Sequence, residues 1–370
     1  MIPPVSELRR TADAVIAIER EAGTPEAAEA RRLLAAHLTA LGYEVETQRF
    51  RFAPSALNAF PIAGAGVGWL TVVAIPLLLL PRAPEWAALA VWLAGLVALA
   101  LVTRGVAMGW GGAGDMREDA NLVARRPGAT VHRWIVAHAD TKAQGHSMAG
   151  RLVAVWVVIG AVVAMTALAA VRLGGAVTPW AVAPAAALVL AAGIAAGRGR
   201  LRGRSRGARD NGSGLVAALA AAETSTDAGT GILVTGAEEF GLVGARVFAE
   251  VARERLAGTD VLNVDTVDER GMLYLVSHDA PGDRLAGALA PALASLGLPV
   301  RRRRLPLGIF VDSHPLARGG AAAVTIGRLD RGTLRLLHTP GDLPDSISFD
   351  TAERLGRLLG GRIDVSAGPA

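Results

Sequence analysis

Residues 134–140 read Trp-Ile-Val-Ala-His-Ala-Asp, four apolar residues that run directly into His138 and Asp140. A short apolar run with an arginine before it and polar residues after it is typical of a buried strand. In an open sheet of parallel strands, ligands bind beyond the carboxyl ends of the strands. We therefore expect His138 and Asp140 to lie at the site-forming edge of such a sheet.

The same pattern recurs twice further along the chain. Glu238 and Glu239 follow an apolar strand-like run, and so does Asp265. Short strands that alternate with helical spacing predict an α/β fold, a mostly parallel mixed sheet flanked by helices. The strands are expected at 43–52, 121–124, 134–137, 231–235, 260–264 and 272–276. The helices are expected at 5–21, 24–41, 214–223, 240–254 and about 283–296.

The composition is too apolar for an ordinary soluble protein, with 52% hydrophobic residues, 19% charged residues and a mean hydropathy of +0.38. Four uncharged runs account for the excess: residues 60–80, 86–102, 152–171 and 180–196. A helix of about 20 residues spans the hydrocarbon layer of a bilayer. The runs therefore predict four transmembrane helices; the alternative is a set of helices buried in a large soluble core.

The four runs form two hairpins, 60–102 and 152–196, so the remaining segments 1–59, 103–151 and 197–370 should share one side of the membrane. Arginines cluster after the last run, at positions 198, 200, 202, 204, 206 and 209, whereas the opposite links carry only Arg82 and Arg172. The positive-inside rule then predicts a multi-pass cell-membrane protein whose polar part is cytoplasmic. No cleavable signal peptide is expected, because the first apolar run starts only at residue 60.

Charge and cysteine content exclude several partners. The net charge is +5, and Lys142 is the only lysine among 38 basic residues. Aromatic residues make up 4% and do not alternate with basic ones, so no nucleic-acid partner is expected. The arginine cluster is interpreted as an orientation signal that contacts anionic lipid. Absence of cysteine excludes disulfides and thiolate metal ligands.

Five side chains are candidate metal ligands: His138, Asp210, Glu239, Asp265 and His338. Two imidazoles with several carboxylates and no sulfur suit Zn²⁺. The excess of carboxylates suits a pair of ions that share a bridging carboxylate. Adjacent side chains diverge, so Glu239 could bind metal while Glu238 takes a proton from water.

The motifs that carry these residues resemble, in their order, the M28 family of zinc metallopeptidases, which includes aminopeptidases and glutamate carboxypeptidases. They are Ala-His-Ala-Asp at 137–140, Arg-Asp-Asn-Gly-Ser-Gly at 209–214, Ala-Glu-Glu-Phe-Gly-Leu-Val-Gly at 237–244, Asn-Val-Asp at 263–265 and His-Thr-Pro-Gly-Asp at 338–342. The resemblance covers most of residues 5–360 apart from the two hairpins. It implies a zinc-exopeptidase fold for the parts outside the hairpins.

The resemblance also implies a role for each site residue. Asp210 would bridge two zinc ions, with His138 and Asp265 on one ion and Glu239 and His338 on the other. Glu238 would be the general base that activates a water shared by the two ions. Asp140 would be a second catalytic residue that orients His138, since a carboxylate on the distal imidazole nitrogen fixes the tautomer.

Two departures from the family pattern bear on function. His138 and Asp210 lie 72 positions apart because the second hairpin is inserted between them, so the site is expected close to the membrane surface. The segment 311–315, Val-Asp-Ser-His-Pro, has the family's Ser-Asp-His order disturbed, and residues 307–310 lack the tyrosine that often stabilises the oxyanion. His314 is the candidate for that role.

The function expected from this combination is a membrane-anchored dizinc aminopeptidase that acts on peptide or aminoacyl substrates. One alternative is a carboxypeptidase or a glutaminyl-cyclase-like enzyme on the same scaffold, the latter with one zinc ion. Another is a degenerate peptidase-like scaffold or transporter component. The apolar runs carry no ionisable residue, which argues against an ion or proton path.

Residues 301–304 are four consecutive arginines. They are interpreted either as an anion-binding edge or as a solvated strand.

Overall fold

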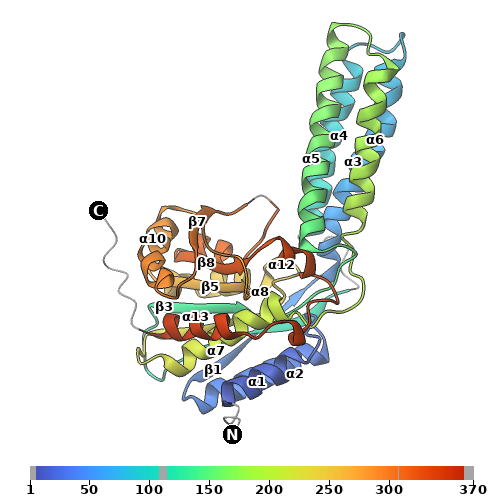
Figure 1. The fold of residues 1–370 in the computed structure, drawn as a ribbon. Helices are drawn as coiled ribbons and strands as arrows, with labels where there is room; N and C mark the ends of the chain where they lie inside the picture. The colour runs from blue at the N-terminus through green and yellow to red at the C-terminus, as the bar shows by residue number, and fades with distance from the viewer. Residues whose placement is uncertain (1–5, 108–114, 307, 362–370) are drawn as a thin grey trace. The chain divides into compact units, whose positions relative to one another are not determined.

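The computed structural model describes residues 6–107, 115–306 and 308–361 (Figure 1). Val5, at the start of the first expected helix, and Leu307 lie outside the described residues. The chain forms two compact units. The α/β unit comprises Met1–Phe52, Arg117–Ala143 and Gly203–Ala370, and the four-helix unit comprises Ala53–Met116 and Gln144–Arg202.

An eight-stranded mixed sheet forms the centre of the α/β unit, in the order β1-β2-β4-β3-β5-β8-β6-β7. Four neighbouring strands, β4, β3, β5 and β8, are parallel, while β1, β2 and β6 join the sheet through antiparallel pairs. The strands are β1 Glu44–Phe52, β2 Arg117–Arg125, β3 Arg133–His138, β4 Thr230–Thr235, β5 Asp260–Val267, β6 Met272–Ser277, β7 Val300–Arg304 and β8 Ala322–Leu329. The prediction of a mixed sheet flanked by helices is confirmed.

Helices cover both faces of this sheet. They are α1 Glu7–Ile16, α2 Pro25–Ala40, α7 Gly214–Thr224, α8 Val243–Val251, α9 Arg253–Leu256, α10 Ala280–Ala294, α11 Ser313–Arg318, α12 Arg331–Leu336 and α13 Asp350–Gly360. Local sequence sets where several begin. The Thr24 hydroxyl, for example, accepts a hydrogen bond from the Ala27 amide, and Pro25 occupies the first turn of α2.

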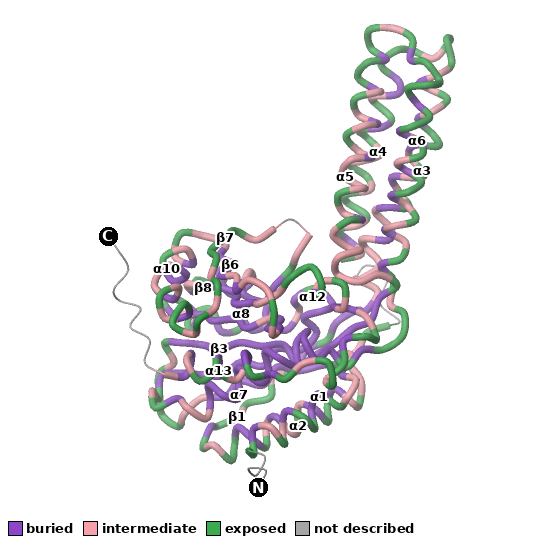
Figure 2. Tube along the Cα trace, viewed as in Figure 1, coloured by how far each residue is buried: buried purple, intermediate pink, exposed green. Residues whose placement is uncertain are grey.

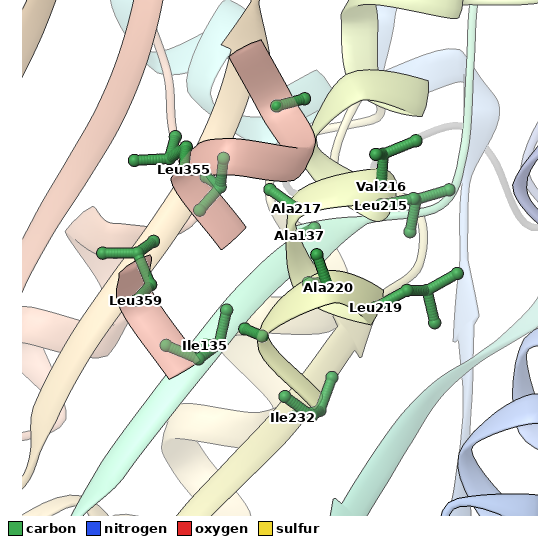
Figure 3. Close-up of a cluster of buried hydrophobic side chains, with 14 of the residues drawn as sticks. Ile135, Ala137, Leu215, Val216, Ala217, Leu219, Ala220, Ile232, Leu355 and Leu359 are labelled. Carbon is green, nitrogen blue, oxygen red and sulfur yellow. The ribbon is translucent and has the colours of Figure 1, made fainter. Parts of the chain in front are cut away.

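Successive side chains of a strand point to opposite faces of the sheet, so the apolar side chains of the central strands enter two separate cores. Ile135 and Ala137 of β3 face α1, α7 and α13, whereas Trp134 and Val136 face α8 and α11. Figure 3 shows α7 and α13 packed on β3 and β4 at the first of these cores. Both faces of the central strands are buried, so these strands are continuous apolar runs and not alternating ones.

The helix expected over 240–254 is shorter and interrupted. It begins only at Val243, and Ala252 separates α8 from α9. Residues before it form a turn with positive φ at Ala237, Gly241 and Leu242, which a helix cannot contain. The arginines 301–304 lie in β7, an exposed strand at the edge of the sheet, which is compatible with both interpretations of that run.

The four-helix unit consists of α3 Ala59–Leu79, α4 Ala87–Ala107, α5 Met148–Val171 and α6 Pro179–Gly197, preceded by the short helix η1 Pro54–Asn58. By length and composition alone, all four helices are long and apolar enough to cross a membrane. Their interior includes one polar pair, in which the Trp92 indole donates to the Thr166 hydroxyl at 2.9 Å. Gly64 of α3 lets Ala196 of α6 approach closely, because a Cβ at Gly64 would lie 2.2 Å from the Cβ of Ala196.

Exposed positions are spread along all four of these helices (Figure 2). Large apolar side chains occupy many of them: Trp69 is 73% exposed, Trp156 61% and Trp180 87%. Arg172, at the end of α5, is buried and donates to the carbonyls of Ala83 and Gly175, so it ties the two interhelical links together. The unit thus packs a narrow apolar interior and presents an apolar exterior.

Candidate metal centre

The candidate ligands lie beyond the carboxyl ends of parallel strands. His138 ends β3, Asp265 lies near the end of β5, and Glu238 and Glu239 occupy the turn that follows β4. The other two come from loops. Asp210 lies at a non-helical kink within the short element η3 (Ala208–Ser213), which leads into α7, and His338 follows α12. Five separate segments of the α/β unit, two of them strand ends, therefore supply the site.

Asp210 lies between the two histidines. Its Oδ1 lies 3.1 Å from His138 Nε2, and its Oδ2 lies 3.2 Å from His338 Nε2. The two carboxylate oxygens therefore face two different imidazoles. Such an arrangement presents one oxygen to each of two neighbouring cations.

Around Asp210 the side chains form two overlapping groups. His138, Asp210 and Asp265 form one group, and Asp210, Glu239 and His338 form the other. Within each group the ligand atoms lie within 4.8 Å of one another. The distances include 3.8 Å from His138 Nε2 to Asp265 Oδ1 and 3.3 Å from His338 Nε2 to Glu239 Oε2. All five side chains named as candidate ligands from the sequence come together here.

The backbone is strained where it places these side chains. Ala237, Thr266 and His338 have φ near +50° to +62°, the left-handed region that non-glycine residues rarely adopt. Ala237 precedes Glu238, and Thr266 follows Asp265 at a register shift between β5 and β8. Strain of this kind persists only where the surroundings hold it, and it clusters at functional sites. No sequence pattern indicated these conformations.

Glu238 is buried beside the two groups but belongs to neither. Burial raises the pKa of its carboxyl well above the ordinary value, and the carboxylates of Glu239 and Asp312 add to this shift although His138 opposes it. A carboxyl in these surroundings holds a proton readily. That behaviour suits an acid–base group next to a cluster of metal ligands.

Asp140 organises the turn that carries both glutamates. Its carboxylate accepts hydrogen bonds from the amides of Glu238 at 3.0 Å and Glu239 at 3.1 Å. His138 Nδ1 lies 3.1 Å from the Asp140 carbonyl oxygen but 3.7 Å from its carboxylate. His138 Nδ1 thus lies closer to the carbonyl of Asp140 than to its carboxylate, and the orienting role of that carboxylate stays a prediction.

The donor set fits divalent cations. Burial disfavours the charged form of His138, yet the surrounding carboxylates, led by Glu238, outweigh it and raise the pKa well above the ordinary value. The pKa of His338 is raised in the same way, chiefly by Glu239 against the effect of burial. Glu239 Oε1 is buried without a hydrogen-bond partner among the described residues. Excess buried negative charge and an unpaired ligand oxygen are what a metal ion would satisfy.

Arg20 supports the site, and sequence reasoning missed it. Its side chain is fully buried and donates to five backbone carbonyls, those of Val15, Ile18, Ala139, Arg206 and Gly207. Ala139 lies between His138 and Asp140, and Gly207 directly precedes η3. Arg20 thus joins the loop of His138 to the loop of Asp210. An arginine that follows an amphipathic helix carries no signal of this role.

Asp342 and Arg209 fix the Asp210 loop. The Asp342 carboxylate accepts from the amides of Arg209 and Asp210 at 3.0–3.1 Å, and the Arg209 guanidinium binds Asp268 at 2.9 Å. Arg209 is buried, so it does not share the exposure of the other arginines that follow the last apolar run. Arginines 198, 200, 202, 204 and 206 are exposed.

His314 lies in a separate polar cluster. Its ring lies against that of His278 at an interplanar angle of 59° with 5.2 Å between centroids, and His278 Nε2 lies 2.7 Å from the Ser313 hydroxyl. Ser313 in turn pairs with Thr325 of β8. The oxyanion role of His314 stays a prediction, because these contacts do not bear on it.

Comparisons with known proteins agree with the observed fold. Residues 186–361 match the model of Peptidase family M28. No protein with a curated description matches the sequence. Among solved structures, the aminopeptidase from Aneurinibacillus sp. strain AM-1 is 15% identical with a TM-score of 0.54, and covers 95% of this chain and 91% of its own.

Two further structures extend the likeness. Fimbriiglobus ruber glutaminyl cyclase is 16% identical with a TM-score of 0.57, covering 98% of this chain and 96% of its own. The zinc aminopeptidase BSAP from Bacillus subtilis is 13% identical with a TM-score of 0.54, covering 95% and 93%. Sequence identities this low support a shared fold and not a shared activity. The chain has the α/β fold of the M28 peptidases, with candidate metal-binding side chains assembled at the edge of its sheet.

Proposed function

We propose that this protein is a membrane-anchored, zinc-dependent exopeptidase, an aminopeptidase that removes residues from the amino end of small peptides. The observation that carries the proposal is Asp210, whose two oxygens face His138 and His338 beside the buried carboxyl of Glu238. His138 and Asp265 would hold one zinc ion, and Glu239 and His338 the other. Asp210 would bind both.

When bound, the ions would acidify water and polarise the carbonyl of the scissile bond. Glu238 would take a proton onto its carboxylate and deliver it to the nitrogen of the leaving amine. Burial raises the pKa of Glu238, which favours a residue that holds the proton between these two transfers. Asp140 would keep Glu238 and Glu239 in place through their amides.

A glutaminyl cyclase is the second candidate, favoured by the likeness to the Fimbriiglobus ruber enzyme. Such an enzyme would cyclise the amino-terminal glutamine of a peptide, whose α-amine attacks the side-chain amide and releases ammonia. The same buried carboxyl, Glu238, would move the proton from the attacking amine to the departing ammonia. Products separate the two candidates, since one yields a free amino acid and the other ammonia.

Anchoring in a bilayer is part of the proposal. Its support is the apolar exterior of α3–α6, whose mean hydropathy over their most apolar windows is 1.9–2.6. The exposed arginines 198, 200, 202, 204 and 206 follow α6 directly, which supports a cytoplasmic location of the α/β unit by the positive-inside rule.

The test uses the full chain purified in lipid nanodiscs. Aminoacyl chromogenic substrates, carboxyl-terminally extended peptides and glutamine-initiated peptides are assayed with and without a chelator. We expect chelator-sensitive release of amino-terminal residues. Ammonia release from glutamine-initiated peptides alone would support the cyclase, and cleavage only at the carboxyl end would support a carboxypeptidase.

Glu238→Gln tests the assigned base. We expect it to retain zinc but to lower kcat by about a hundredfold or more, the usual contribution of a positioned acid–base group. Glu250→Gln, an exposed glutamate on α8, is the matched control and should leave kcat unchanged. Loss of zinc from Glu238→Gln, or full activity in that variant, would contradict the role.

A further inference from the structure

The sheet of the α/β unit ends on two strands of opposite charge. β1 and β7 are the outermost strands in its order, so each pairs with one neighbouring strand only (Figure 1). β1 begins with Glu44 and Glu46, which are both exposed, and β7 carries the exposed arginines 301–304. Within the described residues neither glutamate forms an ion pair, and of the four arginines Arg304 alone does, with Asp283.

The strand register places these charges on one face of the sheet. Directly paired residues of neighbouring strands point to the same face, and side chains alternate along each strand. Glu44 therefore shares a face with Glu46, and Arg301 shares a face with Arg303. We call these two sets the acidic pair and the basic pair. One row of directly paired residues crosses all eight strands and connects the two sets: Glu46, Val123, Leu233, Val136, Asn263, Thr325, Val276 and Arg303.

The basic pair lacks a carboxylate partner on its own face. The Arg303 guanidinium lies 5.4 Å from the centre of the Tyr274 ring, which holds it above β6. Arg302 and Arg304 point to the opposite face, where Asp283 of α10 pairs with Arg304. The face with the acidic pair at one edge thus has unpaired guanidinium groups at the other.

We propose that copies of this protein associate head to tail through these edges, with β1 of one copy pairing with β7 of the next. The inference goes beyond the proposed function and does not depend on the metal centre. An outer strand presents unpaired backbone N–H and C=O groups, so a strand of another chain can extend the sheet. The charges at the two edges select which strand that is.

The direction of the strands fits both charge pairs. β1 and β7 run antiparallel within one sheet, so a copy in the same orientation adds its β1 antiparallel to β7. The basic pair then lies opposite the acidic pair, with Arg301 against Glu46 and Arg303 against Glu44. Opposite charges across a strand pair stabilise it, and like charges destabilise it.

Pairing of β7 with a second β7 is disfavoured, because it would place arginine against arginine. A contact between two different edges also leaves one β1 and one β7 free at the ends of every dimer. Chains of more than two copies can therefore form, as in other heterologous interfaces.

Cysteine crosslinking tests the register, since the natural chain has no cysteine. Val45 of one copy would lie opposite Arg302 of the next, within the Cα separation that a disulfide spans. We expect Val45→Cys and Arg302→Cys, reconstituted together as full chains in lipid vesicles, to form a disulfide on mild oxidation. Each variant alone should form none. Arg51→Cys, exposed near the other end of β1, is the matched control and should not crosslink to Arg302→Cys.

Charge reversal tests the electrostatic contribution. Arg301→Glu combined with Arg303→Glu should weaken association about tenfold or more, because both charge pairs become repulsive. Adding Glu44→Arg and Glu46→Arg to the same chain should restore association, since the charges are exchanged but still complementary. Analytical ultracentrifugation of the full chain in detergent measures both effects. Arg253→Glu with Arg255→Glu, two exposed positions of α9, should leave association unchanged.

Several results would overturn the inference. One is a wild type that stays monomeric at every concentration. Another is a disulfide between two Val45→Cys chains or between two Arg302→Cys chains, because it would show pairing of like edges. A third is a charge-exchanged chain that fails to associate although its circular dichroism matches that of the wild type. None of these results concerns zinc binding or hydrolysis, so the proposed function stands or falls separately.

Discussion

Arg20 shows how one side chain can hold a site that it does not enter. Its guanidinium has backbone carbonyls as partners, and burial lowers its pKa to about 10 although Asp342, Asp140 and Asp210 oppose this shift. It links the loops of His138 and Asp210 through Ala139 and Gly207. Ligands must be held closely for tight metal binding, so such supporting contacts matter as much as the ligands.

Arg20→Met should remove a donor from all five carbonyls; those of Val15 and Gly207 keep a backbone donor, whereas those of Ile18, Ala139 and Arg206 lose the Arg20 hydrogen bond. We expect the free energy of unfolding to fall by at least ~3 kcal/mol, since each unsatisfied buried polar group costs about 1–3 kcal/mol. Zinc affinity should also fall. Chemical denaturation and zinc titration measure both effects, and Arg10→Met, an exposed arginine of α1, should change neither. Unaltered zinc affinity in a destabilised Arg20→Met would contradict the positioning role.

At the scale of elements, the segment that carries Asp210 continues into α7, the helix that begins at Gly214. α7 is buried along nearly its whole length and packs against α13 (Figure 3). The two helices approach closely at Gly356, where a Cβ would lie 2.1 Å from the Ala217 carbonyl oxygen. Only glycine allows this approach, because the clashing atom is backbone and cannot rotate away.

Gly356→Ala should therefore force α13 away from α7. We expect a loss of about 1–3 kcal/mol in the free energy of unfolding, the usual cost of overpacking, although alanine favours a helix. Thermal unfolding followed by circular dichroism measures it. Arg357→Ala, an exposed neighbour that pairs with Glu353, should cost less than about 1 kcal/mol. An equally stable Gly356→Ala would show that the helices can separate at no cost.

At the scale of the molecule, metal binding should stabilise the folded α/β unit. The ligands come from positions 138 to 338, so the unfolded chain does not present them together. Zinc at about a hundred times its dissociation constant should add about 2.7 kcal/mol to the free energy of unfolding. Chelator should lower the melting temperature of the wild type, and Asp210→Ala should show no such response. A melting temperature indifferent to zinc would contradict the metal centre.

The apolar exterior of the four-helix unit leads to a second prediction at this scale. Trp69 is 73% exposed whereas Trp92 is fully buried among the helices. In nanodiscs with brominated lipid, a variant that retains only Trp69 should be quenched strongly, and one that retains only Trp92 weakly. Equal quenching, or none at Trp69, would contradict the placement of these helices in lipid.

The sequence by itself determined the α/β class and most of its strands, because central parallel strands are buried on both faces and form uninterrupted apolar runs. The run 134–137 and the one at 231–235 fall within β3 and β4. It also singled out the five side chains that the structure brings together, since polar residues that end such strands share an edge. The predicted start of the helix at residue 240 is wrong, because a turn with left-handed φ angles precedes α8, which begins only at Val243.

Only the tertiary structure decided which groups surround those side chains. Arg209 has the sequence context of a membrane-proximal arginine, yet it is buried against Asp268 and Asp342. Lys142 and Arg20 owe their partners to loops distant in sequence, such as the turn at Glu239 and the loop at Gly207. Local sequence patterns indicate which face of a helix or strand is apolar. They do not report which charged groups from other loops lie within hydrogen-bonding distance, because chain folding alone sets those distances.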